Sequence, residues 1–111
     1  MHELSITQGI IDICESHAAG RRVLAIDVEI GELSSVVPDA VMFCFEACSQ
    51  DTLLQGARIN IIRIPGRGHC RDCDADTPLP AIFGACQHCG SYQVKIVSGE
   101  ELRVREIEVD E

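Results

Sequence analysis

Four cysteines form two Cys-x-x-Cys pairs, Cys70 with Cys73 and Cys86 with Cys89. Each pair presents two sulfurs to one point, and two such pairs at this spacing supply the four thiolates of a tetrahedral Zn²⁺ centre. Redox dithiols or disulfides are the alternative, but two pairs in one short stretch favour a metal. Because four protein ligands leave no position for water or substrate, we expect this zinc to be structural and not catalytic.

The first three residues, Met1, His2 and Glu3, are a second candidate metal site. The α-amine of Met1 and the amide and imidazole nitrogens of His2 can form fused chelate rings around one ion. The amide or carboxylate of Glu3 lies within reach as a further donor. Nitrogen donors in a tetragonal plane suit Ni(II) or Cu(II), so the residues alone leave both metals open. The donors must lose protons to bind, and affinity should therefore fall as the pH decreases.

The other cysteines, Cys14, Cys44 and Cys48, fall among apolar residues at helical spacing. Free thiols are common in protein cores, so we expect these three to be packing residues. His69 and His88 flank or separate the paired cysteines. Ligation of the metal by either histidine stays open, and we expect them to be exposed groups or neighbours of the ligands.

The chain has 111 residues and a formal charge of −9. A surface with this charge repels phosphate backbones, which argues against nucleic-acid binding. We find neither a basic and apolar leader nor an apolar run near the ~18 residues of a membrane span. Seven cysteines are an odd number, and a metal accounts for four of them. These features predict a cytoplasmic protein that works in a reducing compartment.

Hydrophobic periodicity predicts how the chain positions these sites. A helix is expected up to the stop at Gly20, and a second one from Pro38 to about Cys48. Alternating residues predict strands over 22–30, 57–64, 92–97 and 102–109, the last with either a β-bulge near Arg105 and Glu106 or both of its faces covered. The predicted fold class is α+β, with two helices on a three-stranded sheet and an inserted zinc-ribbon-like lobe of four cysteines. We expect an α+β domain that carries the terminal metal site over residues 1–64 plus 95–111, and a zinc lobe over residues 65–94.

Five motifs, in this order and in a chain of this length, resemble one family across essentially the whole sequence. The chain is similar to the hydrogenase nickel-incorporation proteins, the HypA/HybF family of nickel metallochaperones. The motifs are Met1-His2-Glu3-Leu4-Ser5, Ile30-Gly31-Glu32-Leu33-Ser34, Phe43-Cys44-Phe45-Glu46, the cysteine quartet and Ile107-Glu108-Val109.

The resemblance implies a role and a set of ligands. Nickel would be held by the Met1 amine, the backbone and imidazole of His2 and the backbone of Glu3. The four paired cysteines would hold zinc. The family hands nickel to the immature large subunit of [NiFe] hydrogenase together with a GTPase accessory protein (HypB-like), and in some organisms it also feeds urease. The resemblance thus implies a non-enzymatic carrier, a monomer or weak homodimer, with no nucleic-acid or membrane partner.

Two other classes of protein stay open at this point. A zinc-ribbon module that binds another macromolecule would have the cysteine lobe but no nickel function. An iron-sulfur electron carrier would hold iron between the four thiolates, and a reducible visible spectrum would reveal it.

Overall fold

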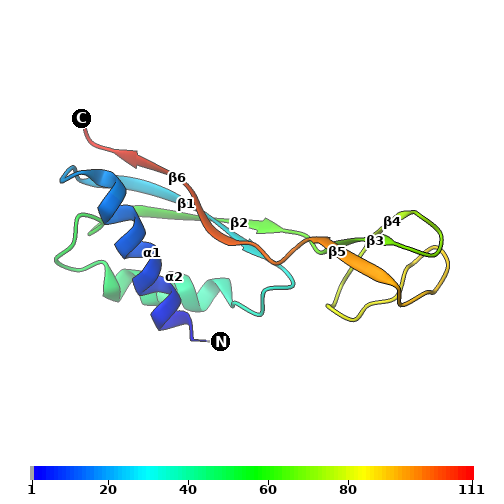
Figure 1. The fold of residues 1–111 in the computed structure, drawn as a ribbon. Coiled ribbons are helices and arrows are strands. Elements are labelled where there is room, and N and C mark those ends of the chain that lie inside the picture. Colours follow the sequence, from blue (N-terminus) through cyan, green and yellow to red (C-terminus); the bar gives the residue numbers. More distant parts are fainter. Residues whose placement is uncertain (1) are drawn as a thin grey trace. The chain divides into compact units, whose positions relative to one another are not determined.

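The computed structural model describes residues 2–111 and confirms an α+β fold with two helices and two three-stranded sheets (Figure 1). The chain forms two compact units, one made of residues 2–29, Val36–Ile62 and Arg103–Glu111, the other of Ile30–Ser35 and Arg63–Leu102. The domain bounds expected from the sequence stay a prediction. The elements are α1 (Glu3–Ala18), β1 (Val23–Gly31), α2 (Pro38–Cys48), β2 (Arg58–Ile64), β3 (Arg67–Cys70), β4 (Asp76–Pro78), β5 (Val94–Ser98) and β6 (Leu102–Val109).

The helices of the first unit begin and end where their residues require it. Helix α1 stops at Ala19, which has a φ of 54°, and Gly20, which has a φ of 81°, because two left-handed residues cannot continue a right-handed helix. Helix α2 begins with Pro38, whose missing N–H would have had no partner in the first turn. Both helices lie on the same side of the sheet (Figure 1).

The sheet has the order β2-β1-β6, which places the last strand of the chain beside the first. Strands β1 and β2 run parallel, because Asp27 pairs with Asn60 and Glu32 with Ile64. The connection between them runs through α2, which makes a β-α-β crossover. Strand β6 runs antiparallel to β1, since the Asp110 amide donates to the Arg22 carbonyl at its far end.

The core of the first unit lies between the helices and the sheet. Fully buried side chains from both layers include Ile11, Cys14, Ile26, Val28 and Val41, and Leu54 between α2 and β2 is also fully buried. Cys14 is therefore a core residue, as predicted. Cys44 and Cys48 are only half-buried, because α2 directs Val41 and Phe45 into the core and leaves its other sides open.

Strand β6 changes its phase in the middle, in agreement with the predicted bulge. Arg103 donates to the Glu29 carboxylate at 2.6 Å on the sheet face that carries no helix. Glu106 and Glu108 line a hollow with Asp27 on that same face. Residues 103, 106 and 108 cannot share a face in a regular strand, whose side chains alternate, so one residue is inserted between them.

The second unit contains the sheet of order β4-β3-β5, in which both outer strands run antiparallel to β3. His69 lies opposite Asp76 in one pairing, and Cys70 lies opposite Val94 in the other. A close backbone approach also marks this unit. A Cβ atom on Gly31 would lie 1.9 Å from the carbonyl oxygen of Gly99, so only glycine fits there.

Candidate metal centres

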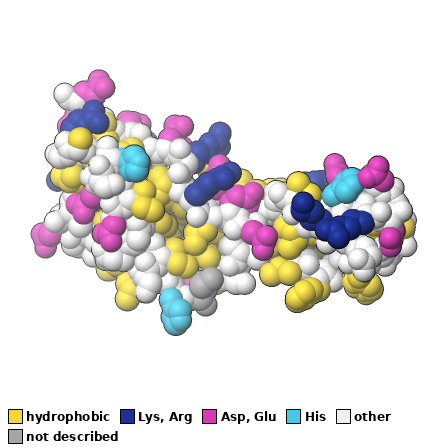
Figure 2. Space-filling view, in the orientation of Figure 1, with side chains coloured by type: hydrophobic (Ala, Val, Ile, Leu, Met, Phe, Trp, Pro, Cys, Tyr) yellow, Lys and Arg dark blue, Asp and Glu magenta, His cyan; other side chains and the backbone are white. Residues whose placement is uncertain are grey.

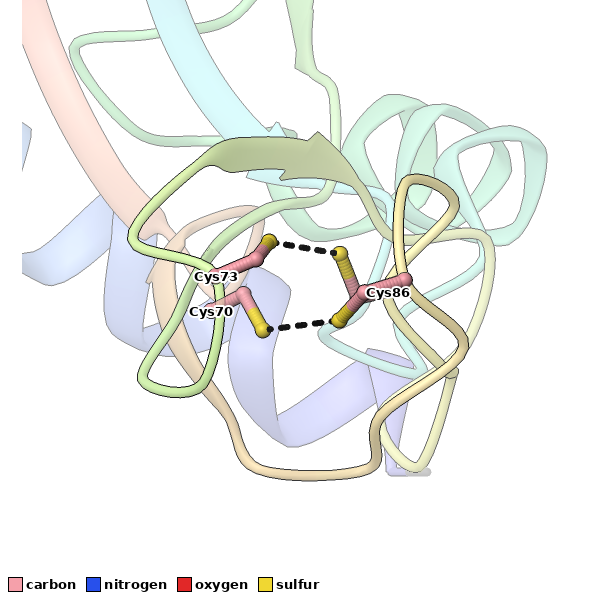
Figure 3. A group of neighbouring side chains, drawn as sticks. Cys70, Cys73 and Cys86 are labelled. Atoms are coloured by element: carbon pink, nitrogen blue, oxygen red, sulfur yellow. Dashed lines mark hydrogen bonds between the residues drawn. The ribbon is translucent and has the colours of Figure 1, made fainter.

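The four paired cysteines converge in the second unit, and their sulfur atoms all lie within 4.8 Å of one another (Figure 3). The Sγ atoms of Cys70 and Cys89 are 3.6 Å apart, and those of Cys73 and Cys86 are 3.7 Å apart. A tetrahedral zinc with Zn–S bonds of about 2.3 Å requires S–S separations of about 3.8 Å. The thiol arrangement is therefore consistent with zinc.

The two cysteine pairs sit on turns that repeat the same backbone geometry. The amide of Asp74 donates to the carbonyl of Cys70 at 2.9 Å, and the amide of Gly90 donates to the carbonyl of Cys86 at 2.8 Å. Asp74 and Gly90, the residues just after each pair, have φ values of 60° and 78°. Left-handed backbone at this position closes each turn and aims its two sulfurs at one point. Aspartate and glycine adopt this conformation more readily than most residues do.

Backbone amides lower the pKa of the Cys86 thiol, whereas the contact with the Cys70 thiol raises the pKa of Cys89. The backbone amide of Cys89, and after it that of His88, outweighs desolvation and lowers the pKa of the Cys86 thiol to about 6. Cys86 and Cys70 are buried, whereas Cys73 and Cys89 reach the surface. A thiol with a lowered pKa gives up its proton to a metal ion more readily.

His69 and His88 point their ring nitrogens at other partners than the metal centre. The Nε2 and Nδ1 atoms of His69 lie 2.7 Å from Asp74 and 3.0 Å from Asp76. Hydrogen bonds to Asp76 and then to Asp74 raise the pKa of His69. The Nε2 atom of His88 lies 3.2 Å from the Asp76 carbonyl oxygen. Both histidines support the cysteine turns, which agrees with the expectation that they are neighbours of the ligands.

Other side chains support the centre, and sequence reasoning did not find them. The buried hydroxyl of Thr77 on β4 accepts a hydrogen bond of 3.0 Å from the amide of Gln87, inside the second turn. Ser91 donates to the carboxylate of Asp72 and so joins the two turns. Thr77 carries no motif of its own, and only the pairing of β4 with β3 brings it to the site.

The candidate nickel donors lie at the start of α1. Met1 lies outside the described residues. His2 is exposed, and its side chain makes no capping hydrogen bond, so the imidazole is free of that role. The Glu3 carboxylate accepts a hydrogen bond of 3.2 Å from the amide of Val37, which is the largest cause of its lowered pKa. The first amides of a helix have no intrahelical acceptor, so the nitrogens of His2 and Glu3 would lose no helix bond on binding a metal.

The fold and the thiol cluster together define a class, a small α+β metalloprotein with a zinc-ribbon-like four-cysteine lobe. The family model described as "Hydrogenase/urease nickel incorporation, metallochaperone, hypA" matches residues 1–109. The chain therefore belongs to the HypA family, which confirms the resemblance inferred from the motifs. It is a nickel metallochaperone of hydrogenase maturation and not an enzyme.

Individual relatives agree with this assignment. The hydrogenase maturation factor HypA of Geobacter metallireducens is 59% identical over 110 residues, which cover 99% of this chain and all of the relative. The factor of the same name from Geobacter sulfurreducens is 57% identical over the same length and coverage. The solution structure of the Ni metallochaperone HypA from Helicobacter pylori has a TM-score of 0.68 and 28% identity, and covers 98% of this chain and 97% of its own.

The chain has a formal charge of −9, and Figure 2 shows acidic and basic side chains interspersed on one face. Hydrophobic side chains also appear between the charged ones on the face shown in Figure 2. Among the described residues, neither helix is long and apolar enough to cross a membrane.

Proposed function

We propose that this chain carries Ni(II) at its amino terminus and hands it to the immature large subunit of [NiFe] hydrogenase. The ligands are the amine of Met1, the backbone and imidazole of His2 and the backbone of Glu3. The observation that supports this site is the exposure of His2 directly before α1, with an imidazole that makes no capping bond. Membership in a nickel-incorporation family favours Ni(II) over Cu(II) as the cargo.

A site at the start of a helix suits a metal that must be released. His2 is exposed, so a partner's ligands can approach the ion without unfolding the first unit. Protons compete for the Met1 amine, whose ordinary pKa is about 7.7–8.0, and for the imidazole of His2. Acidification therefore favours release, and a neutral to alkaline medium favours loading.

The four cysteines Cys70, Cys73, Cys86 and Cys89 hold zinc with a structural role. Their four sulfurs fill a tetrahedral shell, so zinc has no free position for a reaction. The nickel site and the zinc site thus have separate tasks, transfer and folding.

The remaining proposals concern the cellular compartment and the partner proteins, and they rest on membership in the family. We infer a cytoplasmic protein that works with a GTPase accessory protein (HypB-like) and that in some settings also supplies urease. The family model names both hydrogenase and urease. Direct binding measurements with each partner test these assignments.

A nickel titration tests the terminal site. Untagged, zinc-loaded protein that begins at Met1 should bind about one Ni(II) with a planar-type absorption spectrum. His2→Ala should lose this binding, and so should protein acetylated at its amino terminus, because each removes a nitrogen donor of the chelate. His17→Ala is the matched control, since His17 is another exposed histidine of α1 and should bind as the wild type does. Equal binding by all four proteins would refute the terminal site.

A further inference from the structure

The second unit carries a cluster of exposed apolar side chains. Phe83 and Tyr92 are 89% and 75% exposed, and Ile82 is 44% exposed. Phe83 and Tyr92 are half of the aromatic residues of the chain, which has three Phe, one Tyr and no Trp. Large apolar side chains that gather at a surface mark a site for another molecule, and aromatic residues are enriched at protein interfaces.

These side chains border a groove of about 340 Å³ beside β5. Val94 and Ile96 of β5 also line the groove, whereas Lys95, which stands between them in the sequence, does not. Side chains of a strand alternate between its two faces, so Lys95 lies on the opposite face of the sheet. A chain laid along β5 would therefore meet apolar side chains on one face and a positive charge on the other.

Strand β5 is an edge strand of its sheet, and its outer edge has free backbone groups. The carbonyl of Gln93 accepts a hydrogen bond of 2.8 Å from the amide of Arg71, at the start of the pairing with β3. Because peptide groups alternate along a strand, those of Val94 and Ile96 point away from β3. No strand within residues 2–111 pairs with them on that side. An open strand edge beside an apolar groove is the usual receptor for an extended peptide.

Charge indicates which peptide fits this edge. Lys95 is exposed, and within residues 2–111 it takes part in no salt bridge. Basic side chains also lie beside hydrophobic ones on the second unit (Figure 2). An added strand sets one side chain opposite Lys95 and directs the two neighbouring side chains to the groove face. An acidic residue between two apolar residues satisfies both faces, whereas a second copy of β5 paired about Lys95 would set two lysines against each other.

We propose that β5 and its groove bind an extended segment of a partner protein in which acidic and apolar side chains alternate. The segment adds a strand to the sheet of β4, β3 and β5. Its apolar side chains contact Phe83 and Tyr92, and a carboxylate faces Lys95. No proposed nickel ligand takes part, so this surface is independent of the terminal metal site.

The cysteine turns hold the groove. Gly84 stands two residues before Cys86, and Tyr92 stands three residues after Cys89. Both residues line the groove, so a metal that fixes the two turns also fixes its walls. The four-cysteine centre thereby gains a second consequence, because it maintains a surface for a partner in addition to the fold of the lobe.

A chemical-shift titration of the zinc-loaded full chain with three synthetic peptides tests the proposal. The first peptide alternates valine with glutamate, the second valine with lysine and the third glycine with glutamate, each about as long as an ordinary strand. The valine–glutamate peptide should shift the amide resonances of Val94 and Ile96 and bind at least about tenfold more tightly than the other two. Equal binding of the three peptides would overturn the proposal. Shifts of the same resonances on concentrating the protein alone would assign the groove to a second copy and also overturn it.

Single substitutions test the two faces separately. Lys95→Glu should reverse the preference in favour of the valine–lysine peptide, and Phe83→Ser should weaken binding of the valine–glutamate peptide by at least about tenfold. Phe43→Ser is the matched control, since Phe43 is 78% exposed on α2 of the first unit and its replacement should leave binding unchanged. An unchanged preference in Lys95→Glu, or wild-type binding by Phe83→Ser, would contradict the proposal. His2→Ala should bind the peptide as the wild type does, which separates this result from the fate of the nickel site.

Discussion

At the scale of single residues, the protein separates the groups that bind metal from those that shape their surroundings. The sequence was sufficient to predict the cysteines, because Cys-x-x-Cys spacing is a local property of the chain. It was not sufficient to predict the two carboxylates that hold the ring of His69, Asp74 and Asp76, which we call the clamp on His69. The pairing of β3 with β4 brings Asp76 close to His69. The left-handed Asp74 and Gly90 could have been found, since each follows a cysteine pair at a turn.

The clamp on His69 predicts a titration. Hydrogen bonds that the His69 ring donates to Asp76 and Asp74 raise its pKa in the folded state above the ordinary 6.5. A raised folded-state pKa stabilises the protein below the unfolded pKa, and this contribution is lost as the pH rises through the folded value. Proton NMR of the zinc-loaded protein should show His69 titrating above 6.5, and Asp76→Asn should lower that midpoint. An unchanged midpoint in both Asp76→Asn and Asp74→Asn would contradict the clamp.

Replacement by alanine should change stability in opposite directions at Gly90 and at Gly9. Neither Gly90 nor Gly9 has an atom within 4 Å of the position where a Cβ would lie, so neither substitution causes a clash. Gly90 has a φ of 78°, and Gly90→Ala should destabilise the zinc-loaded second unit by about 1 kcal/mol. Gly9 lies inside α1, and Gly9→Ala should stabilise the first unit by about 0.5–1 kcal/mol. Chemical denaturation of both variants measures the difference, and equal signs would refute the backbone argument.

At the scale of elements, the sequence predicted the helices and strands that have strong hydrophobic periodicity. It did not predict a short strand that forms only by pairing with its neighbour. The spacing of apolar residues located α1, β1, α2, β2 and β6 within a few residues of their observed bounds. The three-residue strand β4 was missed, because its form comes from pairing with β3 and not from its own residues. The phase change in β6 was visible beforehand, since Leu102 and Val104 have the opposite parity to Ile107 and Val109.

Removal of zinc should act on one set of elements. The sheet of β3, β4 and β5 has few buried apolar side chains of its own apart from Leu79 and the cysteines, so we expect it to depend on metal binding for its stability. A strong chelator should abolish amide protection in these three strands and leave it in α1, β1 and α2, as hydrogen exchange can measure. Readdition of zinc should restore it. Full protection of β3 in the metal-free protein would show that the lobe folds without metal.

At the scale of the whole molecule, a nickel metallochaperone needs a stable body and a metal site that can open. The first unit supplies a core from two helices and a sheet, and the proposed nickel donors lie at its chain end. The second unit supplies a four-sulfur centre with no position for cargo. This division explains why two metals can be handled in one small protein without exchange of their sites.

The most direct test of the central claim is nickel transfer to its acceptor. Protein loaded with one Ni(II) is mixed with the nickel-free immature large subunit of [NiFe] hydrogenase, and the nickel content of the separated large subunit is followed over time. Wild type and His17→Ala should deliver nickel at the same rate, whereas His2→Ala should deliver no more than free Ni(II) at equal concentration does. Delivery by His2→Ala at the rate of the wild type would contradict the account.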